Sequence, residues 1–492
     1  MTIALFELNE KLRENLSNKI TTFPNETTFN RMMAPMSISA SFEGISRLLS
    51  HVICESLDSY TQQSQRYVPM SDSAFITPKE IEESRFHSAY EALMKDIFEF
   101  YHEITQAKPE KKRGRGSKAD DYEFGIPIED GRYIIPLAAK TNVMATLSGN
   151  KAVNFARNLF EQPQKEAHEH ANDFIASFDD PLIESIIDKH SHSNAVDTES
   201  IQKIYQEMFD KIDKNAVLFD KFNNPIHRVA LGGLSSTNPN TPSSVYAKWE
   251  PEYDRVRFQY SDDKSLQQRF QKFLEANYSE TPTEELDEKK PVLLMEWLNS
   301  FEPTNRATGI AEKILGYGHE SIAEHSRTTY GTEQSLTSYH QFERHRLPSN
   351  IRERFSDIPV DRTVFVPPTV EKSEKNDEFL EMVDRVKDLR EDMINNGYQN
   401  AASYLLLNCD GVKVITNSNA RIDKQMLEQR TCENAQWEIR DRAQALIGLL
   451  KDTVPYIYKR SGPPCTKSDC PEGELSCGKY KVKRKYYGYF GD

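Results

Sequence analysis

The chain has 492 residues and carries 76 acidic against 62 basic side chains, which gives a formal charge of -14 at pH 7. Its length predicts a multidomain globular protein, and the lack of any run of about 18 apolar residues excludes a membrane-spanning one. A pI near 5.5 argues against non-specific nucleic-acid binding, which needs a basic surface. The first residues, MTIALFELNEKLREN, become polar too early for a signal peptide, so we expect a cytoplasmic protein.

In chain order, the first clear helix pattern covers residues 82 to 104, where apolar side chains recur with a 3.6-residue period. The charged segment that follows, 107 to 121, contains Gly and Pro and predicts a solvated loop. Residues 221 to 250 are dense in Asn, Pro, Ser and Gly and mark the best boundary between two halves. A short extended piece at 361 to 368 and a helix over 376 to 398 come next. Because helices alternate with short apolar runs, we predict an α+β class.

A faint internal repeat relates the two halves. Residues 43 to 60 can be laid on 333 to 350 with an offset of 290, and residues 132 to 155 on 403 to 426 with an offset of 271. The N-terminal half must therefore hold 19 extra residues between these segments. We expect the charged loop to supply most of them.

The C-terminal half contains three motifs in order. GYGHESIAEH at 316 to 325 would place polar side chains on one helix face. ERHR follows at 343 to 346, and NARIDKQMLEQR at 419 to 430 leads to AQWEIR. One interpretation of the first motif is a metal site, although helical zinc sites usually place two ligands four residues apart. A polar structural face and a contact to an organic cofactor are the other interpretations.

Together, a G-H-x-S-x-x-E-H segment, an R-H-R triplet and an N-A-R helix resemble the flavin-dependent thymidylate synthase family. The resemblance implies reductive methylation of dUMP to dTMP, with methylenetetrahydrofolate as carbon donor, reduced FAD as hydride source and NADPH as reductant. It also implies two tandem α+β lobes of the family's type, each a mixed β-sheet packed with helices. We place these lobes at 1 to 225 and 251 to 492, with a linker at 226 to 250.

The two halves match the family in a complementary way. Its nucleotide loop, S-x-N-E-x-S-x-R-Y, is matched by SYTQQSQRY at 59 to 67, whereas LPSNIRERFSDI at 347 to 358 departs from it. Conversely, Cys54, Glu55 and Ser56 stand where the N-terminal half should carry the triplet. The resemblance therefore implies that one lobe presents the nucleotide loop and the other the flavin groove. A homodimer of such chains would imitate the family's homotetramer.

The matches imply roles for single residues. Guanidinium and hydroxyl groups would offset the desolvation of a phosphate dianion. The implied nucleotide-binding residues are Gln62, Ser64, Arg66, Arg132, Gln341 and Arg344. Arg430 would be catalytic, because it would face the uracil carbonyls as charge develops on the ring. The implied flavin-lining residues are His319, Ser321, Glu324, Arg344, His345, Arg346, Asn419, Arg421 and Gln425.

The six cysteines predict neither a disulfide framework nor a catalytic nucleophile, since none lies in a Pro-Cys-His context. Three of them gather near the C-terminus as Cys465, Cys470 and Cys477. Their C-x4-C-x6-C spacing matches no established zinc class, so we assign no metal and predict reduced thiols. A metal with Cys432 or a histidine as fourth ligand is the alternative.

Two other functions are compatible with the sequence. Because Gln62 replaces the acid of the nucleotide loop, the enzyme could act on a different nucleotide or give a different one-carbon outcome. A protein without catalysis could bind nucleotide or RNA through the basic segments KKRGRG and KYKVKRKYYGYFG. The thymidylate synthase interpretation implies small-molecule nucleotide and folate partners and needs neither a membrane nor nucleic acid.

Overall fold

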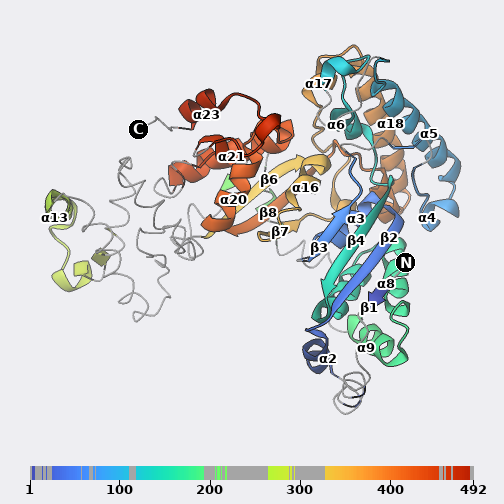
Figure 1. Ribbon diagram of the computed structural model, residues 1–492, viewed down its shortest axis with the longest axis horizontal. Coiled ribbons are helices and arrows are strands. Elements are labelled where there is room, and N and C mark those ends of the chain that lie inside the picture. The colour runs from blue at the N-terminus through green and yellow to red at the C-terminus, as the bar shows by residue number, and fades with distance from the viewer. Residues whose placement is uncertain are drawn as a thin grey trace. The chain divides into compact units, whose positions relative to one another are not determined.

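The computed structural model describes most of residues 25–192 and 327–487, residues 264–287 and several short stretches such as 3–5 and 217–218. Short gaps interrupt these ranges, among them 66–69 and 110–117. Strands and helices are both frequent in the described part of the chain (Figure 1), which confirms the predicted α+β class.

The first sheet has the strand order β1-β2-β4-β3, with antiparallel neighbours. The four strands are β1 (Ile3–Leu5), β2 (Ser37–Ser46), β3 (Ser59–Gln62) and β4 (Lys140–Ser148). Burial alternates strictly along β4, which is typical of a sheet with one face covered and one face in water. The long pair β2 and β4 forms the centre of this sheet (Figure 1).

A β-bulge interrupts β2 between Phe42 and Ile45, where the register with β4 shifts. Gly44 lies in this bulge with a φ of 67°, a left-handed conformation that glycine adopts without steric cost. Its N–H donates to the side-chain oxygen of Asn142 at 2.8 Å. The bulge adds one residue to β2, and this residue alters the alignment of the two halves.

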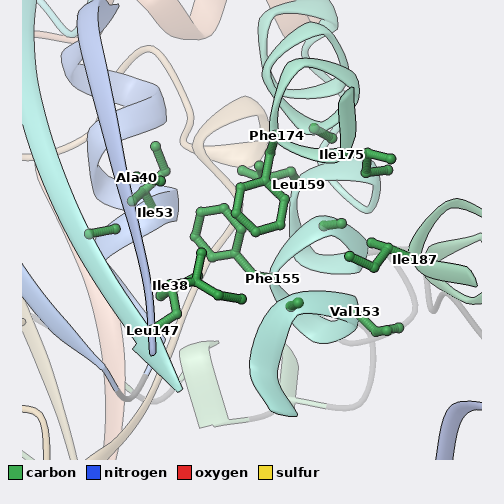
Figure 2. Close-up of a cluster of buried hydrophobic side chains, with 14 of the residues drawn as sticks. Ile38, Ala40, Ile53, Leu147, Val153, Phe155, Leu159, Phe174, Ile175 and Ile187 are labelled. Atoms are coloured by element: carbon green, nitrogen blue, oxygen red, sulfur yellow. The ribbon is translucent and has the colours of Figure 1, made fainter. Parts of the chain in front are cut away.

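The apolar face of the first sheet packs on three helices, α7 (Ala152–Phe160), α8 (Lys165–Ala176) and α9 (Pro181–Ser191). The rings of Phe155 and Phe174 have centroids 4.8 Å apart, and Phe42 of β2 contacts Phe155 at 5.8 Å. Figure 2 shows Phe155 and Phe174 next to each other, with Ile38 and Leu147 on the strand side. This cluster forms the apolar core between the first sheet and its helices.

The second sheet repeats the plan of the first. Its order is β5-β6-β8-β7, with strands β5 (Val217–Leu218), β6 (Arg327–Ser335), β7 (Ser349–Arg352) and β8 (Gly411–Asn419). Each of its two longest strands leads directly into a helix, as β2 and β4 do within a few residues. These helices are α16 (Leu336–Phe342) and α20 (Ala420–Arg430).

The element bounds define the repeat more closely than the letters do. Helix α3 (Arg47–Cys54) corresponds to α16 with an offset of 289, whereas β3 and β7 keep the offset of 290. The bulge in β2 explains why the offset changes by one residue between β2 and α3, because it makes β2 one residue longer than β6. Strands β4 and β8 are offset by 271, as the sequence predicted.

The predicted helices are present as α5 (His87–Ile104) and α18 (Asn376–Asn395), which pack together (Figure 1). Their starts are also 289 residues apart, so the extra residues of the N-terminal half lie between α5 and β4. That interval contains the predicted charged loop. The predicted extended piece at 361 to 368 is confirmed at Val364, which forms a bridge with Asp410, but Pro368 already begins helix α17.

The remaining helices are distributed along the described part of the chain. They include α2 (Glu26–Met33), α4 (Lys79–Glu82), α6 (Ile128–Gly131), α13 (Lys264–Tyr278), α17 (Pro368–Glu371), α19 (Gln399–Ala402), α21 (Trp437–Thr453) and α23 (Tyr480–Tyr486). Within the described residues, no helix combines the length and the apolar character needed to cross a membrane.

Contacts group the chain into two compact units that are not its two consecutive halves. The first unit consists of residues 1–209, 334–346 and 352–413, and the second of residues 210–333, 347–351 and 414–492. Helix α16 and the R-H-R triplet thus belong to the same unit as the N-terminal half. The division into lobes 1 to 225 and 251 to 492 stays a prediction about the repeat.

Candidate functional site

Within the first unit, segments that correspond in the repeat pair with each other. Pro136 forms a bridge with Leu407, its own counterpart at the offset of 271. The N–H of Leu137 donates to the carbonyl of Leu406 at 2.7 Å, and the equivalent bond runs from Asn408 to Ile135 at 2.9 Å. Such reciprocal bonds define a local twofold relation between the two copies.

This twofold relation brings the two repeat helices α3 and α16 together. Both are buried along their whole length, and each begins at a serine, Ser46 or Ser335, whose hydroxyl accepts a bond from the first turn. His51 and His340 correspond at the offset of 289 and lie against each other, with ring centroids 5.1 Å apart. The fold therefore places one histidine from each copy at the centre of the unit.

Glu343, immediately after α16, joins the two histidines. Its Oε2 lies 3.0 Å from His51 Nδ1, and its Oε1 lies 2.6 Å from His340 Nδ1. The buried Arg47 guanidinium acts on the charge of Glu343 from α3. All four side chains are nearly inaccessible to water. Arg47 has no counterpart in α16, where Leu336 stands, whereas Arg344, Arg346 and Arg352 of the other copy also act on the charge of Glu343.

Burial controls the protonation of this cluster. It raises the pKa of Glu343 to about 8, which the positive charge of Arg47 partly opposes. It lowers the pKa of Arg47 to about 9. It also lowers the pKa of His51 and of His340 well below the ordinary value, with the charge of Arg47 acting in the same direction. Both imidazoles are thus neutral near pH 7.

Three ligand atoms of His51, His340 and Glu343 lie within 4.8 Å of one another, the spacing of a candidate metal site. The 2.6 Å between His340 Nδ1 and Glu343 Oε1 is too short for two ligands of one zinc ion, which are roughly 3.3 Å apart in a tetrahedral site. A divalent ion would also lie next to the Arg47 charge. We therefore interpret the group as a buried polar cluster in which Glu343 is hydrogen-bonded to His51.

The neutral histidines predict a measurable acid sensitivity. Below pH 6.5 the unfolded chain binds protons at both histidines, whereas the native state does not. The free energy of unfolding therefore decreases as the pH falls. Replacing His340 by glutamine is expected to make the acid limb shallower by about one proton, or about 1.4 kcal/mol per pH unit. Urea unfolding from about pH 5 to 6.5 measures this slope.

The matched control is His192→Gln, because the His192 side chain is 54% exposed and lies 3.4 Å from the similarly exposed Asp188. This variant should keep the wild-type slope. An unchanged slope in His340→Gln would show that His340 takes up its proton in the native state.

Two arginines predicted to bind the nucleotide lie next to this cluster. Arg132 is buried beside α6, and its Nε donates to the carbonyl of Glu129 at 2.9 Å. Arg344 is exposed, one residue beyond Glu343. The charges of both arginines act on Arg47 and on His340. The structure thus gathers three guanidinium groups, Arg47, Arg132 and Arg344, in one compact unit.

The nucleotide loop of the N-terminal half contacts α3, the helix that carries Arg47 and His51 of this cluster. The Nε2 of Gln62 donates to Ser50 Oγ at 2.9 Å and contacts Cys54 Sγ at 2.8 Å, both on α3. Ser64 is partly exposed and follows in the loop, while Gln341 is buried on α16. Arg66 lies outside the described residues. Described residues predicted to bind the nucleotide therefore come from both copies of the repeat.

The R-H-R triplet also contacts the N-terminal copy, through Arg346. Arg346 donates to the carbonyl of Cys54 and lies over the ring of Tyr60, with its guanidinium carbon 4.7 Å from the centroid. Glu55, which stands near the triplet's place in the N-terminal copy, pairs with Arg352 and accepts a bond from Tyr339 at 2.9 Å. Cys54 and Glu55 of the N-terminal copy are thus matched by partners from the other copy.

His345 follows α16, and its N–H donates to the carbonyl of Phe342 at 2.9 Å. The Cys54 thiol is a poor nucleophile, because burial raises its pKa well above the ordinary value.

Other predicted site residues belong to the second unit and are described there alone. Asn419 is buried, and its side chain accepts a bond from the N–H of Ile422 at 3.1 Å, which begins α20. Arg421 and Gln425 are exposed on this helix, and Arg430 forms its last turn. The predicted residues His319, Ser321 and Glu324 lie outside the described residues.

Sequence reasoning missed Arg47, His51, His340 and Glu343 as members of the site. A lone charged residue in a helix pattern is normally solvated, so their types alone gave no reason to place them inside. One signal was available: His51 and His340 become equivalent once the offset is reduced by one residue in the helices.

The fold and the site thus define an α+β protein with an internal repeat and a cationic centre built from both copies. Residues 7–180 and 259–456 match the model of the family described as thymidylate synthase complementing protein. Because these segments span well over half of the chain, the protein belongs to this family.

Three curated relatives agree, each named flavin-dependent thymidylate synthase. The protein of Clostridium tetani is 31% identical over 196 residues, covering 35% of this chain and 78% of the relative. The protein of Geobacter sulfurreducens is 33% identical over 186 residues, covering 36% and 80%. That of Thermococcus onnurineus is 35% identical over 176 residues, covering 33% and 72%.

Proposed function

We propose that the protein is a flavin-dependent thymidylate synthase that converts dUMP to dTMP, with methylenetetrahydrofolate as carbon donor and NADPH as reductant. The observation that carries this proposal is the gathering of Arg47, Arg132 and Arg344 beside the Gln62 loop. A nucleotide monophosphate is a dianion, and one guanidinium group can donate two parallel hydrogen bonds to its phosphate oxygens. Family membership and the names of the relatives support the same activity.

The residues of this chain divide the work between them. Gln62, Ser64, Arg132, Gln341 and Arg344 bind and orient the nucleotide, and we extend this role to Arg66 from its place in the loop. The neutral histidines and Glu343 fix α3 against α16, which holds Gln62 and Arg344 in one place. Arg430 stabilises negative charge that develops on the uracil ring.

The chemical character of the predicted cofactor residues fits FAD. The diphosphate of FAD requires cationic partners, which Arg344, Arg346 and Arg421 supply, and Arg344 and Arg421 are exposed to a ligand. His345, Asn419 and Gln425 offer hydrogen-bonding side chains, and His319, Ser321 and Glu324 are added from their motif. Bound FAD supplies the hydride chemistry, which no side chain in the protein can provide.

We further propose that the repeat consists of two specialised lobes of the family's type. A homodimer of such chains would present two complete sites, and the enzyme would work in the cytoplasm on free nucleotide and folate. The reciprocal bonds around Pro136 and Leu407 support an origin by duplication.

A single experiment tests the activity. The purified protein is expected to show flavin absorbance, or to gain it with added FAD. After anaerobic reduction, dUMP and methylenetetrahydrofolate together should reoxidise the flavin and yield dTMP. Addition of UMP in place of dUMP is the control. Flavin without turnover of dUMP would mean a different substrate, and a protein that cannot take up FAD would refute both readings.

A further inference from the structure

Four of the six cysteines gather in the second unit, around the end of α20. Cys432 follows the last residue of α20 by two positions, and Cys465 lies in the short helical turn Pro464–Thr466. Cys470 and Cys477 lie on either side of the turn Gly473–Leu475. All four are free thiols, and their exposure ranges from buried at Cys465 to exposed at Cys477.

Side-chain contacts hold the Cys432 segment against the Cys470 to Cys477 loop. The Nδ2 of Asn434 donates to Glu472 Oε2 and to the carbonyl of Leu475, both at 3.1 Å. Glu433 Oε2 pairs with Lys479 Nζ at 3.2 Å. Residues within the loop and just after it are therefore held by the two residues that follow Cys432.

A second set of contacts brings in Cys465. Its carbonyl accepts a bond from Arg484 Nε at 3.1 Å, and Arg484 lies on α23. Lys483 of the same helix forms an ion pair with Glu433. Helix α23 thus connects the segment of Cys465 with that of Cys432.

The thiols are close enough to influence one another. Burial raises the pKa of Cys465, and the presence of Cys470, Cys432 and Cys477 raises it further.

We propose that Cys432, Cys465, Cys470 and Cys477 bind one zinc ion as a structural site. Four thiolates without an open position are typical of structural zinc, and thiolate ligands select zinc over magnesium or calcium. Each thiol would release its proton on binding. The site lies outside the motifs that carry the proposed thymidylate synthase activity.

The charge of the surroundings suits this ion. Zinc with four thiolates has a net charge of -2, which requires positive neighbours in a partly buried place. Helix α23 has the sequence YKVKRKY, and two of its basic residues, Lys483 and Arg484, already contact the cysteine-bearing segments. A disulfide pair would be neutral and would need no such neighbours.

Zinc binding would tighten the loop. Sulfur ligands of one tetrahedral zinc are roughly 3.8 Å apart, whereas no three of these described sulfur atoms lie within 4.8 Å of one another. Gly473 and Gly478 follow Cys470 and Cys477 with φ values of 53° and 70°. These left-handed turns let the loop bend toward an ion without strain on a side chain.

The location of the site suggests a consequence, which rests on the proposed function. Because Cys432 lies two residues beyond Arg430, zinc would fix the end of α20 and thereby position the predicted catalytic arginine. This would be a positioning role, since the zinc itself would not contact the substrate.

Metal analysis of the purified full-length protein tests the proposal. We expect about one zinc per chain, and loss of the zinc in Cys470→Ser and in Cys477→Ser. Ser476→Ala is the matched control, because Ser476 lies in the same loop and its hydroxyl accepts one bond, from the N–H of Gly478 at 3.3 Å. This variant should keep its zinc.

Cobalt substitution of the wild-type protein gives a second readout if a cysteine variant fails to fold. Four thiolate ligands should give an intense sulfur-to-cobalt charge-transfer band and the visible bands of a tetrahedral ion. Iron with labile sulfide, a disulfide among these cysteines, a zinc-free protein, or zinc retained in both serine variants would each overturn the proposal. None of these readouts depends on thymidylate synthesis, so the two proposals fail separately.

Discussion

Replacing Glu343 by alanine is expected to lower the free energy of unfolding by about 3–5 kcal/mol at pH 8.5. At this pH, between the pKa of about 8 for Glu343 and that of about 9 for Arg47, both side chains carry charge. Removing one partner of a buried ion pair leaves the other charge buried and uncompensated, which costs an amount of this size. Urea unfolding followed by circular dichroism measures the change.

The pH dependence of this loss separates charge from packing. At pH 6 the wild-type carboxyl holds a proton, so Arg47 lacks a countercharge in both proteins and the loss should be smaller. The double variant Arg47→Met, Glu343→Leu removes both charges and should recover most of the stability at pH 8.5. An equal loss at both pH values, without recovery in the double variant, would assign the effect to packing.

A surface pair provides the control for Glu343. Lys79 and Glu169 form an ion pair at 2.6 Å, but their side chains are 62% and 47% exposed. Glu169→Ala should change the free energy of unfolding by less than about 1 kcal/mol, because exposed ion pairs contribute little.

The sequence predicted the fold at the level of long periodic helices and of the repeat. Helix α18 begins at the predicted residue, whereas α5 begins at His87, five residues after the predicted start. The difference arises because Glu82 ends the short helix α4, and Ser84 then accepts a bond from the N–H of Phe86, which forms a turn. Such a side-chain turn has no periodic signal in the sequence.

The repeat offset shows a further limit of sequence reasoning. A bulge of one residue at Gly44 shifts the alignment of the helices by one position. This shift decides whether His51 is aligned with Gln341 or with His340 in the repeat. A few identities between helices cannot fix a register to one residue. Hydrogen bonds between the equivalent segments around Pro136 and Leu407 can fix it.

The complementary losses in the two copies have a physical explanation in the first unit. A copy that lost its triplet could use the Glu55 position for a partner of Arg352 and Tyr339, while the other copy kept Arg344. Because α3 and α16 share one buried interface, a change in one helix alters the environment of the other. Motif reading detected that the losses were complementary, but only the packing shows which side chains replaced the lost contacts.

Replacing Arg132 by methionine is expected to weaken dUMP binding roughly 10- to 150-fold, because a charge-assisted contact contributes about 1.5–3 kcal/mol. Methionine keeps most of the buried volume, and the backbone carbonyl of Arg132 still accepts its bond from Asn408 at 2.9 Å. Equilibrium titration of the flavin protein with dUMP measures the dissociation constant. Arg132→Lys should restore part of the affinity, since lysine retains the charge but not the paired donors.

The matched control for Arg132 is Arg85→Ala, in the same compact unit. The Arg85 side chain is 63% exposed and pairs only weakly with Asp392 at 3.4 Å, so dUMP affinity should be unchanged. Equal weakening in both variants would mean that general electrostatic attraction to a basic surface governs binding. An unchanged affinity in Arg132→Met would show that Arg132 does not bind the phosphate. The buried Arg47 would then have to attract the phosphate without the help of Arg132. Only a selective loss in Arg132→Met, partly restored by lysine, agrees with a phosphate held by the guanidinium groups of both copies.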